Sequence, residues 1–571
     1  MIWRSTVAIV VLLVAAATYP GAVAVSMVVR LTPPPANSSA APAGVLPWLH
    51  VEHRQGPQPF ISDDLGRLIL LHGAIPASLL DFGSSDKSRT DSPPPYPIDP
   101  AAYDNGRCPD ASAVSRYPPL CQSDLAQMAA LGFNSLRLPL SWSLLEPARG
   151  QFNQTYVDRL AQVVDWARGL DMHVIIDMHQ NAYSRYVGPG KDVDLSYNSG
   201  APAWATLTDG VPSQVLVGGQ REANPAVFEA FSNFWYNRAG IQDQYIAAIG
   251  VLAKRFKDDS TVAGYSIFNE PQNGWNLPPG FEDLLLFPFY RRVIDAVTGV
   301  GDGLPCPTGI FMPAFCGYAD LGIHDLRHMF FLEPGLLRQI TDFPTHLGLP
   351  LSSYPNLVYD IHAYTHGYTP DALLFHQDPN HATYPWGGYD QTYALGLREA
   401  KVLNAALFVS EFGNDPKNDS LLLANETLEM EKHQVGFAFW TWKENGGSGA
   451  WGMFDPPGAG VSPRPSSGCL RIQRERLLAR VYPRASSDHE FTYHYDPASA
   501  SFTLKAHGSA GDAPTVVYIP PEVKGAVAIS GTAAPVTDTS PDGSRLVTAT
   551  PVGGPFSIAV GPAPLALIGC A

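Results

Sequence analysis

The chain has 571 residues, of which 45% are hydrophobic and 16% are charged. This length exceeds one ordinary domain, and it suits a barrel of roughly 250–400 residues joined to a smaller partner. The formal net charge of −16 argues against nucleic acid or another polyanion as partner and permits a neutral substrate.

The N-terminus has the features of a targeting segment. Arg4 precedes an apolar run over residues 7–17, and Pro20-Gly21 and a small-residue cleavage pattern at 22–24 follow it. Read through to Val29, the apolar run is about long enough to span a bilayer. We therefore expect residues 1–30 to be a cleaved signal peptide or a signal-anchor. The chain would then be secreted, lie in an endomembrane or lysosome-like lumen, or be anchored to a membrane.

Two further features agree with export. Glycosylation sequons begin at Asn37, Asn153, Asn418 and Asn425. The six cysteines form an even number, as is typical of oxidising compartments. Fifteen pairings are possible, and sequence proximity favours Cys108 with Cys121 and Cys306 with Cys316, which leaves Cys469 with Cys570. No two cysteines have CxxC spacing, and we expect no metal ion and no other cofactor.

Residues 31–60 are rich in Pro, Ala and Ser and are predicted to form a linker. From 61 to 484, short apolar strands alternate with helices, which indicates βαβ units and a parallel sheet. A loose stretch at 82–118 is expected to be a surface insertion, and helices are expected at 124–131, 156–170 and 244–256. The expected strands are 68–71, 135–140, 173–178, 263–268, 310–313, 357–361, 406–410 and 436–441. Eight such strands favour a closed (β/α)8 TIM barrel over an open sheet.

After residue 484 the pattern changes. The runs 491–495, 501–505 and 515–519 are rich in β-forming residues, and Gly, Pro and Asp separate them. No helical periodicity intervenes. Residues 485–571 are therefore predicted to form a small C-terminal antiparallel β-sandwich.

Polar residues follow the predicted strands of the barrel. Glu270 stands in Asn269-Glu270-Pro271 after the fourth strand, and Glu411 ends the seventh. The carboxyl ends of barrel strands form the active site, so the two glutamates should face each other across its mouth. Two carboxyl groups about 5–5.5 Å apart are the machinery of a retaining glycosidase, with one as nucleophile and the other as general acid/base.

Other strand ends supply a plausible supporting set. Arg137 can keep Glu411 ionised, and Tyr364 can orient it. Asn269 can bind a sugar 2-OH. The remaining candidates are His179 and His362 for hydroxyls or for tuning Glu270, and Trp440 as a flat floor for the sugar ring. Each residue alone has an ordinary structural explanation, but packing does not explain six such strand ends in succession.

This ordered set closely resembles glycoside hydrolase family 5 over roughly residues 60–475. The resemblance implies that Glu270 is the acid/base and Glu411 the nucleophile. It also implies that the family's Arg, first His, Asn, second His, Tyr and strand-eight Trp correspond to Arg137, His179, Asn269, His362, Tyr364 and Trp440, with Trp442 as a second candidate for the last role.

A narrower resemblance is to the endoglycoceramidase branch. It rests on the motifs at 142–147, 176–185 and 200–204 and on the trailing β-sandwich. Members cleave an oligosaccharide from ceramide or act on related glucolipids such as glucosylceramide and steryl glucosides. The branch usually has Asp where this chain has Asn181, at a position near the sugar. The resemblance therefore leaves open which glycan is accepted.

Recognition of a lipid would require an apolar groove beside the acid/base. The segment Leu277 to Tyr290 is a candidate for lining such a groove or contacting a membrane surface, and an ordinary helix packed on the barrel is the alternative. Three functions therefore compete: a glycolipid β-glycosidase, a hydrolase of soluble β-glucan or β-mannan, and an inactive glycan-binding barrel. Binding alone does not require both glutamates with their full supporting set, which argues against the last.

Overall fold

The computed structural model describes residues 45–569, with gaps at 54–57, 83–95, 110–116, 189, 191–192, 217–219, 277–279, 302–316, 346–353, 365–388, 445–449 and 456–468. The expected signal segment, the first part of the expected linker and the expected strand at 310–313 lie outside the described residues.

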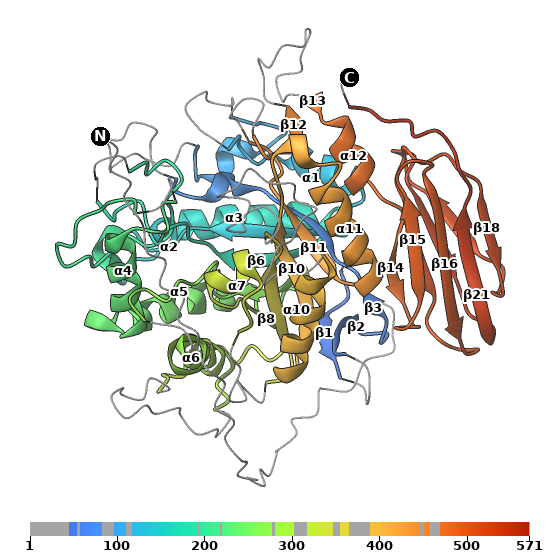
Figure 1. The fold of residues 1–571 in the computed structure, drawn as a ribbon. Coiled ribbons are helices and arrows are strands. Elements are labelled where there is room, and N and C mark those ends of the chain that lie inside the picture. Colours follow the sequence, from blue (N-terminus) through green and yellow to red (C-terminus); the bar gives the residue numbers. More distant parts are fainter. Residues whose placement is uncertain are drawn as a thin grey trace, which may run out of the picture.

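Eight parallel strands form a closed barrel at the centre of the molecule (Figure 1), which confirms the predicted TIM barrel. The strands are β4 (His72–Ile75), β5 (Ser135–Leu140), β6 (His173–Met178), β7 (Val262–Ser266), β8 (Met329–Leu332), β9 (Leu357–His362), β10 (Ala406–Phe412) and β11 (Gly436–Trp440). Nearly every residue in them is buried, as expected of strands that face a packed interior on one side and helices on the other.

Helices surround the barrel. They are α1 (Gln122–Ala130), α2 (Trp142–Leu145), α3 (Gln154–Arg168), α4 (Pro225–Trp235), α5 (Ile241–Phe256), α6 (Phe287–Thr298), α7 (Leu336–Thr341), α10 (Asp390–Val402), α11 (Leu422–His433) and α12 (Ile472–Leu478). In α3, the Asn153 side chain caps the first turn by accepting from Tyr156 N, and one apolar face that includes Leu160 and Val164 is buried.

Two barrel strands differ from those expected. The first is His72–Ile75 rather than 68–71, because Leu68 and Ile69 pair instead with the C-terminal sheet. The fifth is Met329–Leu332, which pairs with β7 and β9. The fifth position of the barrel, which was predicted for 310–313, is therefore taken by β8.

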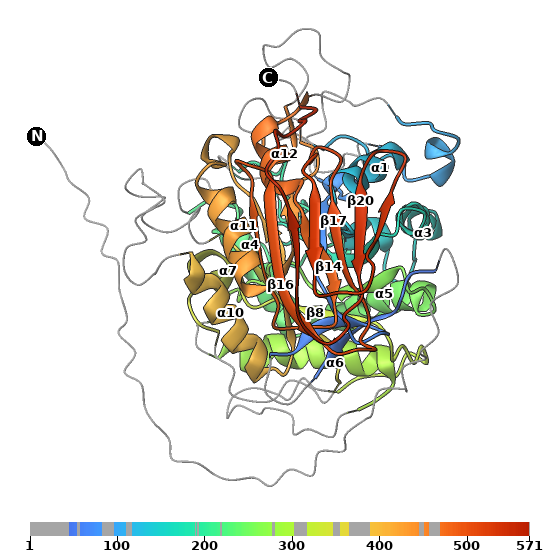
Figure 2. The same ribbon diagram turned by 90° about the vertical axis from the view of Figure 1, so that its right-hand side faces the viewer.

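The C-terminal region forms two antiparallel sheets that pack beside the barrel (Figures 1 and 2), as predicted for a sandwich. One contains β15 (Thr492–Asp496), β16 (Ser501–Gly508), β18 (Val527–Ser530) and β21 (Gly554–Val560). The other contains β14 (Tyr482–Ser486), β17 (Thr515–Ile519), β19 (Val536–Thr539) and β20 (Arg545–Ala549), extended by β1 (Leu49–Glu52), β2 (Phe60–Asp63) and β3 (Leu68–Ile69). A small two-stranded sheet, β12 (Phe454–Asp455) with β13 (Cys469–Leu470), completes the fold.

The strands β1 to β3 stand partly where a linker was expected. Leu49, Val51 and Ile61 from this segment pack with apolar side chains of the barrel interior. Val51 N also donates to Asn356, just before β9 begins, so the segment covers the N-terminal end of the barrel. The opposite end of the barrel, where the parallel strands end, is not covered by this segment and remains available for the expected active site.

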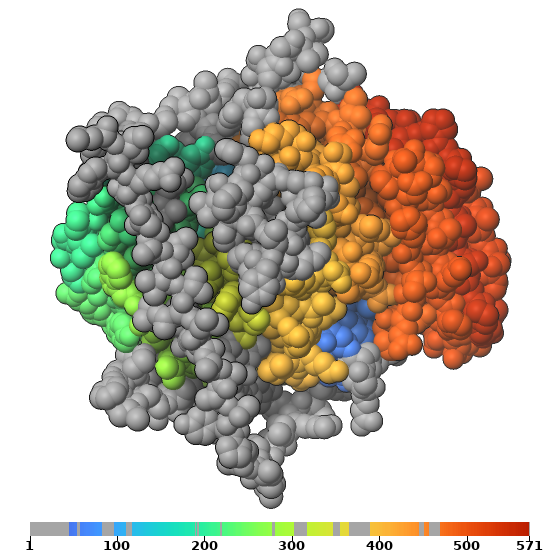
Figure 3. All heavy atoms as spheres, viewed as in Figure 1, coloured from blue at the N-terminus to red at the C-terminus, as the bar shows by residue number. Residues whose placement is uncertain are grey.

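The sandwich packs against the helices of the last part of the barrel, as the space-filling view shows (Figure 3). The buried carboxylate of Glu431 on α11 joins the two parts, because it accepts from Arg480, from His494 Nδ1 at 2.7 Å and from Tyr495 N at 3.2 Å. Cys108 and Cys121 form the expected disulfide.

Cys469 is also disulfide-bonded. Its expected partner Cys570, and the expected pair Cys306 and Cys316, lie outside the described residues. Within the described part of the chain, no helix has the length and apolar character needed to cross a bilayer.

Candidate active site

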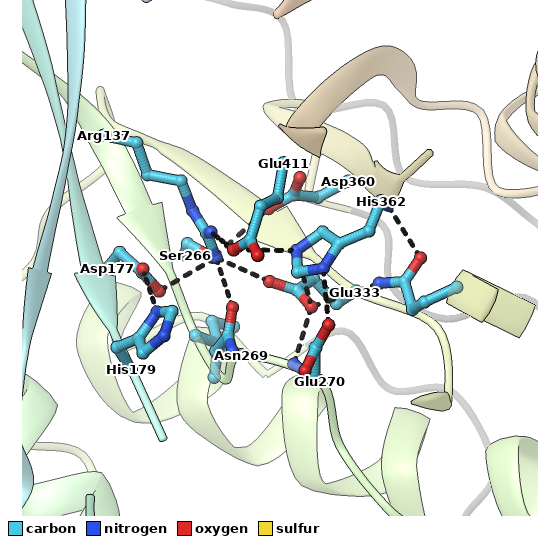
Figure 4. Close-up of polar contacts among 12 residues, drawn as sticks. Arg137, Asp177, His179, Ser266, Asn269, Glu270, Glu333, Asp360, His362 and Glu411 are labelled. Atoms are coloured by element: carbon cyan, nitrogen blue, oxygen red, sulfur yellow. Dashed lines mark hydrogen bonds and ion pairs between the residues drawn. The ribbon is translucent and has the colours of Figure 1, made fainter. Parts of the chain in front are cut away.

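Glu270 and Glu411 face each other at the mouth of the barrel (Figure 4). One carboxyl oxygen of each lies within 4.8 Å of the other and of a ring nitrogen of His362. Glu270 follows β7 with a left-handed φ of 44°, and Glu411 lies in β10. This separation is close to that of retaining glycosidases, and it leaves no room for the intervening water of an inverting enzyme.

Glu411 is held by two donors. Arg137 Nη1 lies 2.9 Å from Oε2, and the Tyr364 hydroxyl donates to Oε1 at 2.7 Å. Burial and the negative charge of Glu270 raise the pKa of Glu411, whereas His362 and Arg137 lower it. The raising effects are larger, so the net shift of the pKa is upward. Both donors fix the direction in which the carboxylate points.

Arg137 lies within β5, is completely buried and contacts several carboxylates. Its Nη2 lies 2.8 Å from Glu333 Oε1 and 3.2 Å from Asp177 Oδ1, and it donates to Asn269 Oδ1 at 2.9 Å. Burial alone would lower the pKa of Arg137, but the surrounding carboxylates outweigh it and raise the value. The guanidinium is therefore permanently charged.

Glu270 has a different environment. Its Oε1 lies 3.0 Å from His362 Nδ1, and its backbone N–H donates to Glu333 Oε2 at 2.7 Å. Burial raises the pKa of Glu270, but the hydrogen bond and charge of His362 outweigh it and the net shift is downward. Burial lowers the pKa of His362, whereas Glu333 and Glu411 raise it well above its usual value. The proton between these two groups therefore resides on the imidazole.

His179 and Trp440 form one wall of the site. The His179 ring lies parallel to the Trp440 indole, with ring centroids 5.6 Å apart. Its Nδ1 is bound to Asp177 Oδ2 at 2.8 Å, and its buried Nε2 has no partner among the described residues. A sugar hydroxyl is the kind of group that would satisfy this nitrogen.

A pocket of about 730 Å³ opens above the two glutamates. Beside Glu411 its walls are aromatic: Tyr117 contacts Trp440, and Tyr364 contacts Trp451. Beside Glu270 its wall combines polar residues, including Gln272 and Asn273, with apolar side chains of the short helix α7. The first residue of α7 donates from its backbone N–H to Pro271 O. The lining side chains of α7 are Leu336, Leu337 and Ile340.

Asn181 also lines this pocket. Its side-chain oxygen accepts from Arg221 Nη2 at 3.3 Å, and the Arg221 guanidinium lies over the Tyr197 ring. This contact fixes which end of the amide faces Arg221.

The structure places two of the sequence-predicted candidates outside the pocket lining. Trp442 does not line it: this residue is buried, donates to Asp124 and packs on Phe133, because β11 ends at Trp440 and the chain then turns into the core. The segment 281–289 forms no groove either, because Phe281, Leu285 and Phe289 are buried in the barrel core. The apolar wall next to Glu270 comes from α7.

Sequence reasoning missed Glu333, which is completely buried and contacts both Arg137 and Glu270. Its signal was the run Met329 to Leu332, a short apolar strand followed by an acid, like the other strand ends. It also missed Asp360 in β9, a buried carboxyl that accepts from Ser266. Burial and the neighbouring charge of Glu333 raise the pKa of Asp360 to about 7.

Glu270, His362 and Glu411 form a group of side chains close enough to surround a metal ion. Arg137, however, binds one oxygen of Glu411, and its permanent charge opposes a second cation there. The arrangement is suited to moving protons and to attack by a carboxylate.

The family model of Cellulase (glycosyl hydrolase family 5) matches residues 111–446. The chain belongs to glycosyl hydrolase family 5. It is therefore a glycoside hydrolase.

Individual relatives match this chain with low sequence identity. Endoglycoceramidase I from Rhodococcus hoagii is 24% identical over 437 residues, which cover 72% of this chain and 74% of that protein. A probable glucan 1,3-beta-glucosidase A from Aspergillus niger is 24% identical over 351 residues, 59% of this chain and 72% of that protein. The crystal structure of an endogalactoceramidase matches with a TM-score of 0.66 and 25% identity over 90% of this chain and all of the other.

Proposed function

We propose that this enzyme hydrolyses the β-glycosidic bond between a sugar and the lipid of a glycolipid, with retention of configuration. The observation that carries the lipid half is the apolar wall of α7 beside Glu270, where the leaving group departs. A second support is the similarity to Endoglycoceramidase I and to the endogalactoceramidase structure. The aromatic end of the pocket, with Trp440 and Trp451, suits the sugar.

The mechanism has two displacements. The Glu411 carboxylate attacks the anomeric carbon, the bond from that carbon to the lipid oxygen breaks, and Glu270 transfers a proton to this oxygen. A water molecule then enters, Glu270 takes one of its protons, and the hydroxide oxygen displaces Glu411 from the sugar. The product keeps the β configuration.

The proton for the first step comes through His362. In the free enzyme it resides on the imidazole, 3.0 Å from the Glu270 carboxylate. Once substrate covers the pair, water is excluded and the charged forms become less favourable, so the proton moves to Glu270 and leaves both groups neutral. Glu270 is then the acid that the leaving oxygen requires.

Activity on a soluble β-glucan is the second candidate, favoured by the similarity to the glucan 1,3-beta-glucosidase. A panel of glucosylceramide, a longer glycosphingolipid, a steryl glucoside and a soluble β-glucan separates the two, with products identified by mass spectrometry. We expect free sugar and free lipid from at least one glycolipid. Release of sugar from the β-glucan alone would overturn the glycolipid proposal.

We further propose that the enzyme works outside the cytosol and touches membranes at the pocket mouth. The Cys108–Cys121 disulfide supports an oxidising compartment. Leu337 on α7 is 46% exposed, and Trp275, which packs on the pocket-lining Phe228, is 52% exposed; both support contact with a lipid surface near the pocket. N-terminal sequencing of the exported protein tests the localisation, and a protein retained in the cytosol would contradict it. Sedimentation with phosphatidylcholine vesicles tests the membrane contact, and a protein that does not sediment with the vesicles would contradict it.

A further inference from the structure

We propose that Glu333 is a positioning residue that holds the acid/base and the nucleophile in their working geometry. This inference rests on the roles proposed above for Glu270 and Glu411. Glu333 stands at the end of β8, with no exposed surface, so it acts through other residues and does not touch substrate.

Each carboxyl oxygen of Glu333 serves one of the two catalytic glutamates. Oε1 lies 2.8 Å from Arg137 Nη2, and the other arm of the same guanidinium binds Glu411. Oε2 accepts the backbone N–H of Glu270 at 2.7 Å and lies 3.3 Å from His362 Nε2, whose Nδ1 faces the Glu270 carboxylate. One rigid group therefore connects both halves of the site.

The backbone of Glu270 needs such an anchor. Its φ of 44° is a left-handed conformation that side-chain-bearing residues rarely adopt, and it persists only where surrounding contacts hold it. The hydrogen bond from its N–H to Glu333 is such a contact, and the Gln180 side chain donates to the carbonyl oxygen of Glu270 at 3.0 Å. Without Glu333, the carboxyl of Glu270 would lose its fixed direction.

Gln339 on α7 extends the same connection. Its side-chain nitrogen donates to Glu333 Oε2 at 3.1 Å, and its oxygen accepts the backbone N–H of His362 at 2.8 Å. Gln339 thus clamps the residue that supplies the proton without contacting Arg137 or Glu411. A change at Gln339 should therefore affect the Glu270 half more than the Glu411 half.

The substitution Glu333→Gln keeps the size of the side chain but replaces one oxygen by an amide nitrogen. Arg137 and the Glu270 N–H are both donors, so the amide can satisfy only one of them. Negative charge is also lost beside His362, which lowers its pKa. The other charged groups around this ring are Glu270, Glu411, Asp360, Asp177 and Arg137.

The test compares two glycosides of one sugar that differ in the leaving group. A dinitrophenyl β-glycoside departs without a proton, whereas an alkyl β-glycoside requires the acid. For Glu333→Gln we expect kcat/KM to fall on both, with the alkyl glycoside losing at least about tenfold more. We also expect the alkaline limb of its pH profile to move to lower pH. For Gln339→Met we expect the alkyl glycoside to be slowed and the dinitrophenyl glycoside to be spared.

Asp325→Asn is the matched control, because Asp325 is a buried acid bound to His328 before β8 begins, at the other end of the barrel. Equal losses on both glycosides for the folded Glu333 and Gln339 variants, with an unmoved alkaline limb, would reduce Glu333 to a structural ion-pair partner and overturn the inference. If Glu333→Gln does not fold, Gln339→Met decides alone. A wild-type enzyme that hydrolyses neither glycoside nor any glycolipid would instead refute the proposed function.

Discussion

Replacing Leu337 by serine should weaken hydrolysis of a glycolipid far more than hydrolysis of a water-soluble aryl glycoside. Leu337 lines the pocket on α7 and is 46% exposed in the free enzyme. Full burial of a leucine side chain contributes about 1.5–3 kcal/mol, so covering the exposed half with lipid contributes roughly 1 kcal/mol. The expected loss in kcat/KM on the glycolipid is therefore about fivefold.

The assay uses glycolipid in detergent micelles beside the aryl glycoside, with Leu326→Ser as the matched control. Leu326 is 50% exposed, but it precedes β8 at the far end of the barrel and does not line the pocket. The aryl glycoside should change by less than about twofold in either variant, since neither position contacts the sugar. Equal losses on both substrates for Leu337→Ser, or equal effects of the two substitutions on the glycolipid, would refute the assignment of α7 to the lipid.

Three further predictions concern the carboxyl groups. Glu411→Gln should lower turnover of every substrate more than about a thousandfold. Glu270→Ala should retain activity on dinitrophenyl glycosides, and azide should increase its rate. If azide instead rescues only the Glu411 variant, the two roles are exchanged. Because the pKa of Glu411 is raised and the nucleophile must be ionised, the acidic limb of kcat/KM should lie above pH 4.5, and a lower limb would contradict this. Burial raises the pKa of Glu426 to about 8, so the unfolded chain binds fewer protons and stability should fall between pH 4.5 and 8, by at most about 1.4 kcal/mol per unit. Glu426→Gln should remove this fall in thermal melts, leave pH 4 unchanged and raise stability at pH 8; parallel melting curves would argue against it.

Much of the site followed from the sequence because its residues sit at strand ends within short distinctive motifs. Parallel pairing brings the strands that carry Arg137, Asn269, Glu270 and Glu411 together, and the order of the strands in this barrel is their order in the chain. Local sequence was enough to place a site residue wherever that residue stands in, or directly after, a recognisable strand.

The fifth strand was missed because local sequence gave two equal choices. The apolar run at 310–313 and the run at Met329 to Leu332 are both short, and only pairing with β7 and β9 distinguishes them. Glu333 was not predicted as a site residue because the strand that it follows was not predicted. The segment around Phe281 stayed open between two structures for a related reason, since an apolar stretch does not reveal whether it lines a groove or packs in the barrel core.

In the proposed mechanism, Glu411 attacks the sugar, and Glu270 donates a proton to the leaving oxygen and later accepts one from water. A 2-deoxy-2-fluoro β-glycosyl fluoride should trap the glycosyl-enzyme, because the fluorine slows both displacements and the good leaving group still permits the first. Peptide mapping of the trapped protein by mass spectrometry then locates the sugar. We predict a single label on Glu411; a label on Glu270, or steady turnover without any covalent adduct, would contradict the proposed mechanism.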